Sequence, residues 1–274
     1  SPIIPARPPG RFRFAARRVT FLHRARIIGV VMSSSIHQVR SLRVSITSRC
    51  DLHCVYCRPA GQCGPGASGA ARFSPAQVAA LCEMLRDEFG LRPVRITGGE
   101  PLDCPEIAQW VRALGGTGLE VALTTNGRRL CALAGELREA GLARVNVSLD
   151  ALDPARFRRI TGGEIEPTLR GIEAAQAAGL DPLKTNTVVL RGWNENEVTA
   201  VAAYAFERGI EARFLELMNI GCARGHHAQW FVGADEVLGR LAERYELRPL
   251  GRQVGGTARR FEGRDGARPL GVGG

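Results

Sequence analysis

The sequence predicts an α/β protein, a partial TIM-type barrel of six β/α units, and three observations lead to this prediction. Short β-branched runs alternate with longer stretches of helical periodicity along most of the chain. Several of the helical stretches stop at a glycine, a residue that commonly ends helices. Polar and unusual residues follow the strands, where the βα loops of such a barrel build an active site. The pattern predicts a parallel sheet covered by helices over residues 41–250.

Six segments have the composition of strands, at 42–47, 94–97, 119–125, 144–149, 183–190 and 212–217. Helical stretches follow them at 74–90, 104–116, 128–141, 166–179, 194–209 and 233–245. The first helix has the clearest start, because Ser74 suits the N-cap and Pro75 the first helical position. The apolar run at 27–32 is far too short to span a bilayer. We therefore expect a soluble, cytoplasmic protein without a membrane partner.

The two ends of the chain differ in composition from the barrel region. Residues 1–31 hold seven arginines and no acidic residue, whereas the 30 basic residues from Met32 onward face 27 acidic ones. The nearly neutral barrel disfavours a nucleic-acid partner. We expect residues 1–40 to be an unstructured basic extension or the product of a misplaced start; a basic arm and a transit peptide are the alternatives. Residues 251–274, rich in glycine and arginine, are predicted to form a short irregular tail.

Three cysteines crowd the segment after the first strand. Cys50, Cys54 and Cys57 stand within the sequence SRCDLHCVYC. A disulfide framework suits a chain of this size poorly, and structural zinc usually needs a second ligand pair, which does not follow at finger-like spacing. A redox dithiol would leave Cys50 unused. Three thiolates on one loop match three corners of an iron–sulfur cluster; a zinc site or a metal-free loop remains the alternative on spacing alone.

Together with Gly98-Gly99-Glu100-Pro101 after the second strand, this segment resembles the radical S-adenosylmethionine (SAM) superfamily. The resemblance implies one [4Fe–4S] cluster on the three cysteines, with an open iron that binds the amino and carboxylate groups of SAM. Gly98 and Gly99 would let the backbone approach the methionine ammonium without a Cβ in the way, and Glu100 would offset its positive charge. Tyr56 would lie near the adenine, or pack the loop.

Further motifs resemble the GTP 3′,8-cyclase family of molybdenum-cofactor biosynthesis, in order and spacing over 41–260. By this resemblance, the SAM-contacting positions are Tyr56, Gly99, Ser148 and Met218. The GTP-contacting positions are Arg43, Arg95, Thr124 and Lys184. A triphosphate needs several cations on one face of the barrel, and Lys184 is the only lysine of the chain. Arg213 joins this set or forms a structural ion pair.

The resemblance implies that a 5′-deoxyadenosyl radical abstracts a ribose hydrogen of GTP, which starts cyclisation to the pterin precursor. It also implies an electron donor such as a flavodoxin or ferredoxin, and a downstream enzyme that takes the precursor. The family carries a second cluster on three cysteines of a C-terminal extension, but no cysteine follows Cys222 here. We expect a cyclase truncated before that region, with residues 251–274 as its remnant. A radical SAM enzyme for a peptide or small metabolite and a non-catalytic nucleotide-binding relative are the alternatives.

Overall fold

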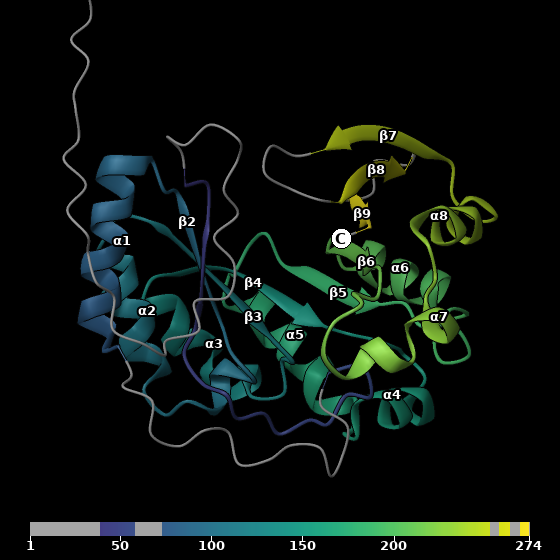
Figure 1. The fold of residues 1–274 in the computed structure, drawn as a ribbon, viewed down its shortest axis with the longest axis horizontal. Helices are drawn as coiled ribbons and strands as arrows, with labels where there is room; N and C mark the ends of the chain where they lie inside the picture. Colours follow the sequence, from purple (N-terminus) through teal and green to yellow (C-terminus); the bar gives the residue numbers. More distant parts are fainter. Residues whose placement is uncertain (1–38, 58–72, 253–257, 264–268, 274) are drawn as a thin grey trace, which may run out of the picture.

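The computed structural model describes residues 39–57, 73–252, 258–263 and 269–273, and Figure 1 shows their arrangement. The six strands of the barrel are β1 (Leu42–Ser45), β2 (Pro93–Thr97), β3 (Glu120–Thr125), β4 (Leu142–Ser148), β5 (Lys184–Val188) and β6 (Glu211–Leu215). They are parallel and pair in chain order. The predicted partial barrel is confirmed, because β1 and β6 do not pair with each other and the sheet stays open. The expected leader falls almost wholly outside the described residues.

Helices connect the strands and cover the outer face of the sheet (Figure 1). The main helices are α1 (Pro75–Phe89), α2 (Ile107–Gly115), α3 (Leu130–Glu139), α4 (Pro154–Thr161), α5 (Glu166–Ala177), α6 (Val198–Glu207) and α8 (Ala234–Ala242). Shorter elements are the 3-10 helices η1 (Pro101–Asp103) and η2 (Gly221–Gly225) and the helix α7 (His227–Trp230). The start of α1 agrees with the prediction: Ser74 and Gln77 form a capping box, and Pro75 opens the helix.

One of the main helices was not predicted from the sequence. The helix α4 lies between β4 and α5, and the Asp153 side chain caps it by accepting a hydrogen bond from the Arg156 N–H at 2.8 Å. Pro154 opens it and Gly162, with φ 77°, ends it in the left-handed conformation. These start and stop signals were present in the sequence, but only eight residues separate them, too few for a clear helical period.

The C-terminal segment forms regular structure where an irregular tail was predicted. The strands β7 (Leu247–Arg252), β8 (Arg259–Gly263) and β9 (Leu270–Val272) extend the sheet beyond β6 as a meander. β9 pairs parallel with β6 and antiparallel with β8. Leu270 and Val272 are buried, and these two apolar residues dock a segment whose glycine and arginine content hides the alternation of a strand. Within the described ranges, no helix has the length and apolar composition that a membrane crossing requires.

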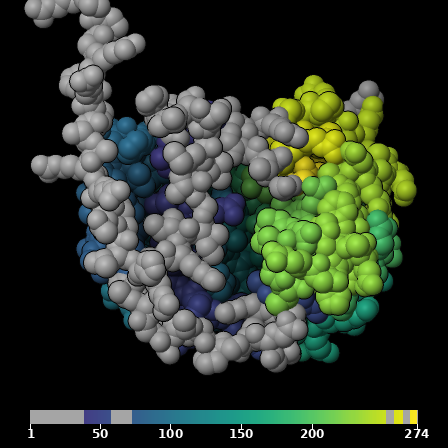
Figure 2. All heavy atoms as spheres, viewed as in Figure 1, coloured from purple at the N-terminus to yellow at the C-terminus, as the bar shows by residue number. Residues whose placement is uncertain are grey.

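Side chains alternate between two faces of each strand and give the barrel a polar interior. Leu42, Val94, Val121 and Val145 belong to the buried hydrophobic core. The next residue of each of the first three strands, and Arg144 on β4, lie on the opposite face. Figure 2 shows a hollow between the purple-to-blue side of the molecule and its green-to-yellow side. The charged residues of the strands therefore belong to the interior of an open barrel, called the lumen below.

Candidate active site

The loop with the three cysteines follows β1 and is fastened by backbone hydrogen bonds on two sides. The ladder between β1 and β2 continues into it, since the Gly99 and Glu100 N–H groups donate to the Thr47 and Arg49 carbonyls at 2.8 and 2.6 Å. On its other side, the His53 and Val55 N–H groups donate to the end of α4, at 2.8 and 2.9 Å. The loop is thus held between the end of β2 and the unpredicted helix α4.

The thiols of Cys50, Cys54 and Cys57 lie close enough to interact electrostatically. Burial raises the pKa of Cys50 to about 11, and burial, Asp150 and the other two thiols raise the pKa of Cys54 well above its usual range. A cluster that takes these sulfurs as thiolates would replace the protons and remove the mutual repulsion. Three soft sulfur donors on one loop suit iron–sulfur ligation.

Across the described residues, no three cysteine, histidine or acidic side chains are grouped tightly enough to hold a single metal ion. A cubane cluster makes a different demand, because each cysteine binds a different iron and the sulfurs stand further apart than the ligands of one ion. The cluster on Cys50, Cys54 and Cys57 therefore stays a prediction that this finding does not test.

Gly98 and Gly99 are required by the close approach of two loops. A Cβ added at Gly98 would stand 2.6 Å from the Thr47 carbonyl oxygen, and one at Gly99 would stand 2.0 Å from that of Arg49. The sequence assigned both glycines to the approach of SAM. The structure adds a second reason, because they let the end of β2 lie directly against the backbone that carries Cys50.

We expect Gly99→Ala to destabilise the protein and lower its iron content. The new methyl group would meet backbone rather than a movable side chain, and such overpacking costs about 1–3 kcal/mol. Gly135→Ala is the matched control, because Gly135 lies within α3 with no atom within 4 Å of an added Cβ; it should gain about 0.5–1 kcal/mol. Urea unfolding and iron analysis measure both effects. A Gly99→Ala protein with wild-type stability and iron content would show that this packing is unimportant.

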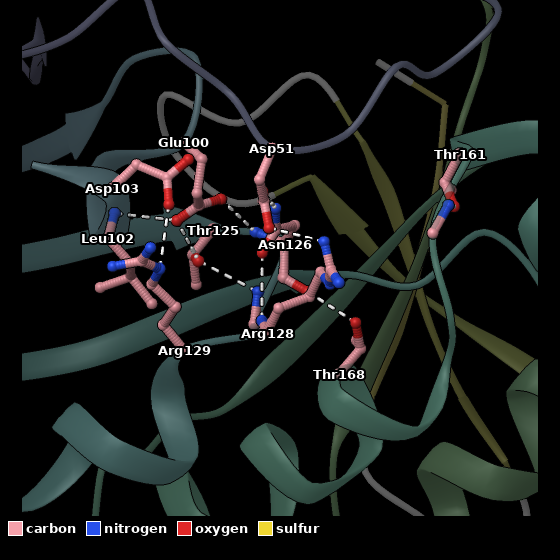
Figure 3. Close-up of polar contacts among 12 residues, drawn as sticks. Asp51, Glu100, Leu102, Asp103, Thr125, Asn126, Arg128, Arg129, Thr161 and Thr168 are labelled. Atoms are coloured by element: carbon pink, nitrogen blue, oxygen red, sulfur yellow. Dashed lines mark hydrogen bonds and ion pairs between the residues drawn. The ribbon is translucent and has the colours of Figure 1, made fainter.

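Glu100 connects the loops after β2 and β3, as Figure 3 shows. Its side chain is buried, and Oε1 accepts hydrogen bonds from the Leu102 N–H at 2.9 Å and the Thr125 hydroxyl at 2.6 Å. Oε2 accepts one from the Asn126 N–H at 2.7 Å. Burial raises the pKa of Glu100 to about 7, against the opposing effect of these hydrogen bonds. Since the protein itself uses both oxygens, the expected contact with the SAM ammonium stays a prediction.

Asp51, the residue after Cys50, is hydrogen-bonded by two side chains of the segment after β3 (Figure 3). The Asn126 amide donates to Asp51 Oδ1 at 2.7 Å, and Arg128 Nη1 donates to Oδ2 at 2.6 Å. The Asn126 carbonyl in turn accepts a hydrogen bond from the Thr168 hydroxyl on α5, at 3.0 Å. The cysteine loop is therefore fixed to three neighbouring β/α units by side-chain as well as backbone contacts.

Tyr56 points its hydroxyl toward the end of β4. The hydroxyl donates to Asp150 Oδ2 at 2.7 Å, and Asp150 Oδ1 accepts from the Val188 N–H at 2.9 Å. Burial raises the pKa of Asp150 to about 6. This contact fixes the hydroxyl end of Tyr56, which lies in the chain between the predicted cluster ligands Cys54 and Cys57. Its place beside an adenine is not tested by the structure and stays a prediction.

The other predicted SAM and GTP positions lie at different heights in the barrel. Ser148 is the last residue of β4, and Met218, 65% exposed, follows β6 at the same end. Thr124, on β3, faces the lumen by its alternation with the buried Leu123 and Thr125. Arg43, Arg95 and Lys184 lie further back along their strands. The predicted SAM positions therefore gather at the strand ends, and the predicted phosphate positions lie deeper.

Arginines form a layer across the first four strands. Arg43 and Arg95 are in register on β1 and β2, and Ala122 connects Arg95 to Arg144 on β4. Burial and the charges of Arg43, Arg144 and Arg213 lower the pKa of Arg95 to about 10. Within the described residues, the buried Arg95 Nε makes no hydrogen bond. Such a concentration of like charge is unfavourable unless an anion binds there.

Lys184 and Arg213 share one carboxylate on the other side of the lumen. Lys184 Nζ lies 2.7 Å from Glu211 Oε2, and Arg213 Nε lies 2.8 Å from Oε1. The two cations hold the pKa of Glu211 below its usual range although burial opposes this. The structure thus brings the predicted Lys184 and Arg213 together, and each forms an ion pair with Glu211.

Sequence reasoning missed several residues of this site, namely Asp51, Asn126, Arg144, Asp150 and Glu211. A signal existed for Arg144, because it lies on β4 next to the buried Val145. A signal also existed for Glu211, because it opens β6 between the buried Ile210 and Ala212. For Asp51, Asn126 and Asp150 the only signal was their place after a strand. The partners named above lie between 26 and 94 residues away in the chain, so only the fold identifies them.

The sequence of this chain is similar to those of known proteins. Residues 44–205 match the Radical SAM superfamily. GTP 3′,8-cyclase 1 of Pseudomonas aeruginosa strain PAO1 is 40% identical over 231 residues, which cover 81% of this chain and 68% of the relative. The GTP 3′,8-cyclase of Acidothermus cellulolyticus is 39% identical over 242 residues, covering 85% of this chain and 67% of the relative. The chain thus spans about two thirds of their length.

A solved structure shares the fold at low sequence identity. Streptococcus suis SuiB bound to S-adenosylmethionine superimposes with a TM-score of 0.60 at 16% sequence identity. The match covers 76% of this chain and 47% of that one. This similarity supports the open, mostly parallel barrel.

Proposed function

We propose a function for this chain from the family to which it belongs, the radical SAM superfamily and, within it, the GTP 3′,8-cyclase family. The chain generates a 5′-deoxyadenosyl radical, which removes a ribose hydrogen of GTP. This step starts cyclisation to the pterin precursor of molybdenum cofactor. A [4Fe–4S] cluster and SAM are the cofactors that this family implies. When bound, they supply the electron and the C–S bond whose cleavage yields the radical. The residues of the chain bind, orient and enclose the reactants.

We assign the cluster to Cys50, Cys54 and Cys57, as a single cluster with three protein ligands. SAM would lie over the strand ends, against Tyr56, Gly98, Gly99, Ser148 and Met218. The network of Glu100, Asp51 and Asn126 supports this assignment, because it fixes the cysteine loop against the loops after β2 and β3. A fixed loop keeps the reacting atoms at a constant separation, which is the main contribution that a protein makes to cofactor chemistry of this kind.

The GTP triphosphate would bind the lumen cations, with Arg43, Arg95 and Lys184 as ligands and Thr124 between them and the strand ends. The β1 ladder reaches the cysteine loop at Thr47, four residues after Arg43. The distance along the strand between these two residues is about 13 Å, at about 3.3 Å per residue. An extended ribose triphosphate suits this depth: its phosphates would lie among the arginines and its ribose near the strand ends. The arginine layer is the observation that carries the proposal, and it favours a polyphosphate over a peptide or an uncharged metabolite.

Two protein partners belong to the same proposal. Cys57 is exposed, and an electron donor such as a flavodoxin or ferredoxin would approach the cluster from that side. A downstream enzyme would accept the pterin precursor.

Anaerobic reconstitution tests the proposed chemistry. The reconstituted chain should contain about four irons and about four sulfides, and with dithionite it should cleave SAM to 5′-deoxyadenosine faster when GTP is present. About eight irons would contradict the single cluster. A chain that binds no iron and forms no 5′-deoxyadenosine would contradict the whole proposal.

A further inference from the structure

The C-terminal meander brings a further cation to the lumen. In register, Arg213 on β6 pairs with Gly271 on β9, and Gly271 pairs with Arg260 on β8. Residues in register across neighbouring strands share a face of the sheet, so Arg260 lies on the face of Arg213. Gly271 has no side chain, and nothing from β9 stands between the two arginines.

Arg260 lies beside the carboxylate that holds Lys184 and Arg213. One Nη of Arg260 is 3.7 Å from Glu211 Oε2, a distance too long for a hydrogen bond but short enough for attraction between charges. Within the described residues, Arg260 Nε is buried and makes no hydrogen bond. Glu211 thus attracts Arg260 without occupying its donors.

Lys184 and Arg213 differ from Arg260 in this respect. Each already donates a hydrogen bond to Glu211, at 2.7 and 2.8 Å. An Arg guanidinium has five N–H donors in a planar fork that matches a phosphate. Arg260 therefore retains the better capacity to bind an anion that enters the lumen.

The net charge of the lumen also favours the binding of an anion. The lumen is lined by six cations, namely Arg43, Arg95, Arg144, Lys184, Arg213 and Arg260. Two carboxylates oppose them: Glu120, which pairs with Arg144, and Glu211. An excess of four positive charges remains, and a nucleoside triphosphate carries compensating charge along its phosphates.

We propose that Arg260 is a further phosphate-binding residue of this site, presented by the C-terminal meander and positioned by Glu211 to bind a terminal phosphate of the nucleoside triphosphate. The proposal rests on the proposed function for the identity of the ligand. It assigns the meander a role in substrate binding, since β8 and β9 carry the residue into the lumen.

Binding measurements on the full 274-residue chain test this role, with GTP, inorganic tripolyphosphate and guanosine as probes. Arg260→Ala should weaken binding of GTP and of tripolyphosphate by about 10- to 100-fold, the loss of one hydrogen-bonded ionic contact, and should leave guanosine binding unchanged. Arg260→Lys should restore part of the loss, because a point charge replaces the fork. The substitution should not unfold the protein, since Glu211 keeps Lys184 and Arg213 as partners.

Arg259→Ala is the matched control. Arg259 is the neighbour of Arg260 on β8, and it pairs with the exposed Asp235 on α8 at 2.6 Å. Its removal makes the same change in charge and loosens the same meander, but should leave tripolyphosphate binding unchanged. Equal losses in both variants, or no loss in Arg260→Ala, would overturn the direct contact.

The outcomes separate this inference from the proposed function. If tripolyphosphate binding depends on Arg260 but GTP does not stimulate 5′-deoxyadenosine formation, the phosphate site stands and the cyclase chemistry fails. If GTP is turned over with the same KM in Arg260→Ala, the proposed function stands and the role of Arg260 is wrong.

Discussion

Cys54→Ser should lose most of the iron of the reconstituted protein and all detectable formation of 5′-deoxyadenosine. Cys54 is the middle ligand of the predicted cluster, and burial raises its pKa above the usual range, so only metal binding gives its sulfur a stable charged form there. A serine hydroxyl is a harder and far less acidic ligand. Iron analysis, the visible absorption of the cluster and chromatography of the SAM products measure the loss.

Cys131→Ser is the control for this change. Cys131 is exposed on α3, and it lies far in the chain from the cysteine loop. The variant should keep about four irons per chain and full SAM cleavage. If Cys54→Ser retained its cluster, or if both variants lost it equally, the assignment of the cluster to the loop after β1 would be wrong.

Arg95→Met should make the protein more stable and bind GTP about 10- to 100-fold more weakly, by the loss of one or two ionic hydrogen bonds. Folding buries the Arg95 guanidinium among Arg43, Arg144 and Arg213, and this lowers its pKa to about 10. The charged form is therefore less favourable in the folded than in the unfolded chain. Removing the charge relieves that repulsion, for a gain on the order of 1 kcal/mol. Methionine retains the aliphatic volume.

The two effects are measured by thermal unfolding without ligand and by equilibrium binding of GTP. Arg112→Met serves as the control, because Arg112 forms an exposed ion pair with Glu136, at 3.5 Å, on the outer helices. Its stability should change by less than about 0.5 kcal/mol and its GTP affinity should stay the same. A less stable Arg95→Met protein with normal GTP affinity would mean that Arg95 is a structural residue and not a phosphate ligand.

Much of the fold followed from local patterns. The six barrel strands lie within a few residues of their predicted positions, because their β-branched runs are buried on the face that packs against the helices. The meander was missed for the opposite reason. Leu270 and Val272 are its fully buried apolar side chains, and Leu247 and Phe261 pack only partly buried against the core. Such scattered apolar residues among glycines and arginines do not produce a readable period. Its position depends on pairing with β6, which only the folded chain provides.

The candidate site shows a similar division. The spacing of the cysteines identified the cluster loop, since the ligands are neighbours in the chain. Glu211 could not be found in this way, because its partner Lys184 lies 27 residues earlier and the register of β5 and β6 brings them together. Gly99 was noticed but only partly explained, because the contact that requires it is with the backbone of Arg49.

One labelling experiment directly tests hydrogen transfer from the GTP ribose. The reconstituted chain is incubated with SAM, dithionite and GTP that carries deuterium at C3′, and the 5′-deoxyadenosine is analysed by mass spectrometry. We expect a product about one mass unit heavier than that formed with unlabelled GTP, because the radical takes the ribose hydrogen. Unlabelled 5′-deoxyadenosine, formed at the same rate with and without GTP, would contradict it.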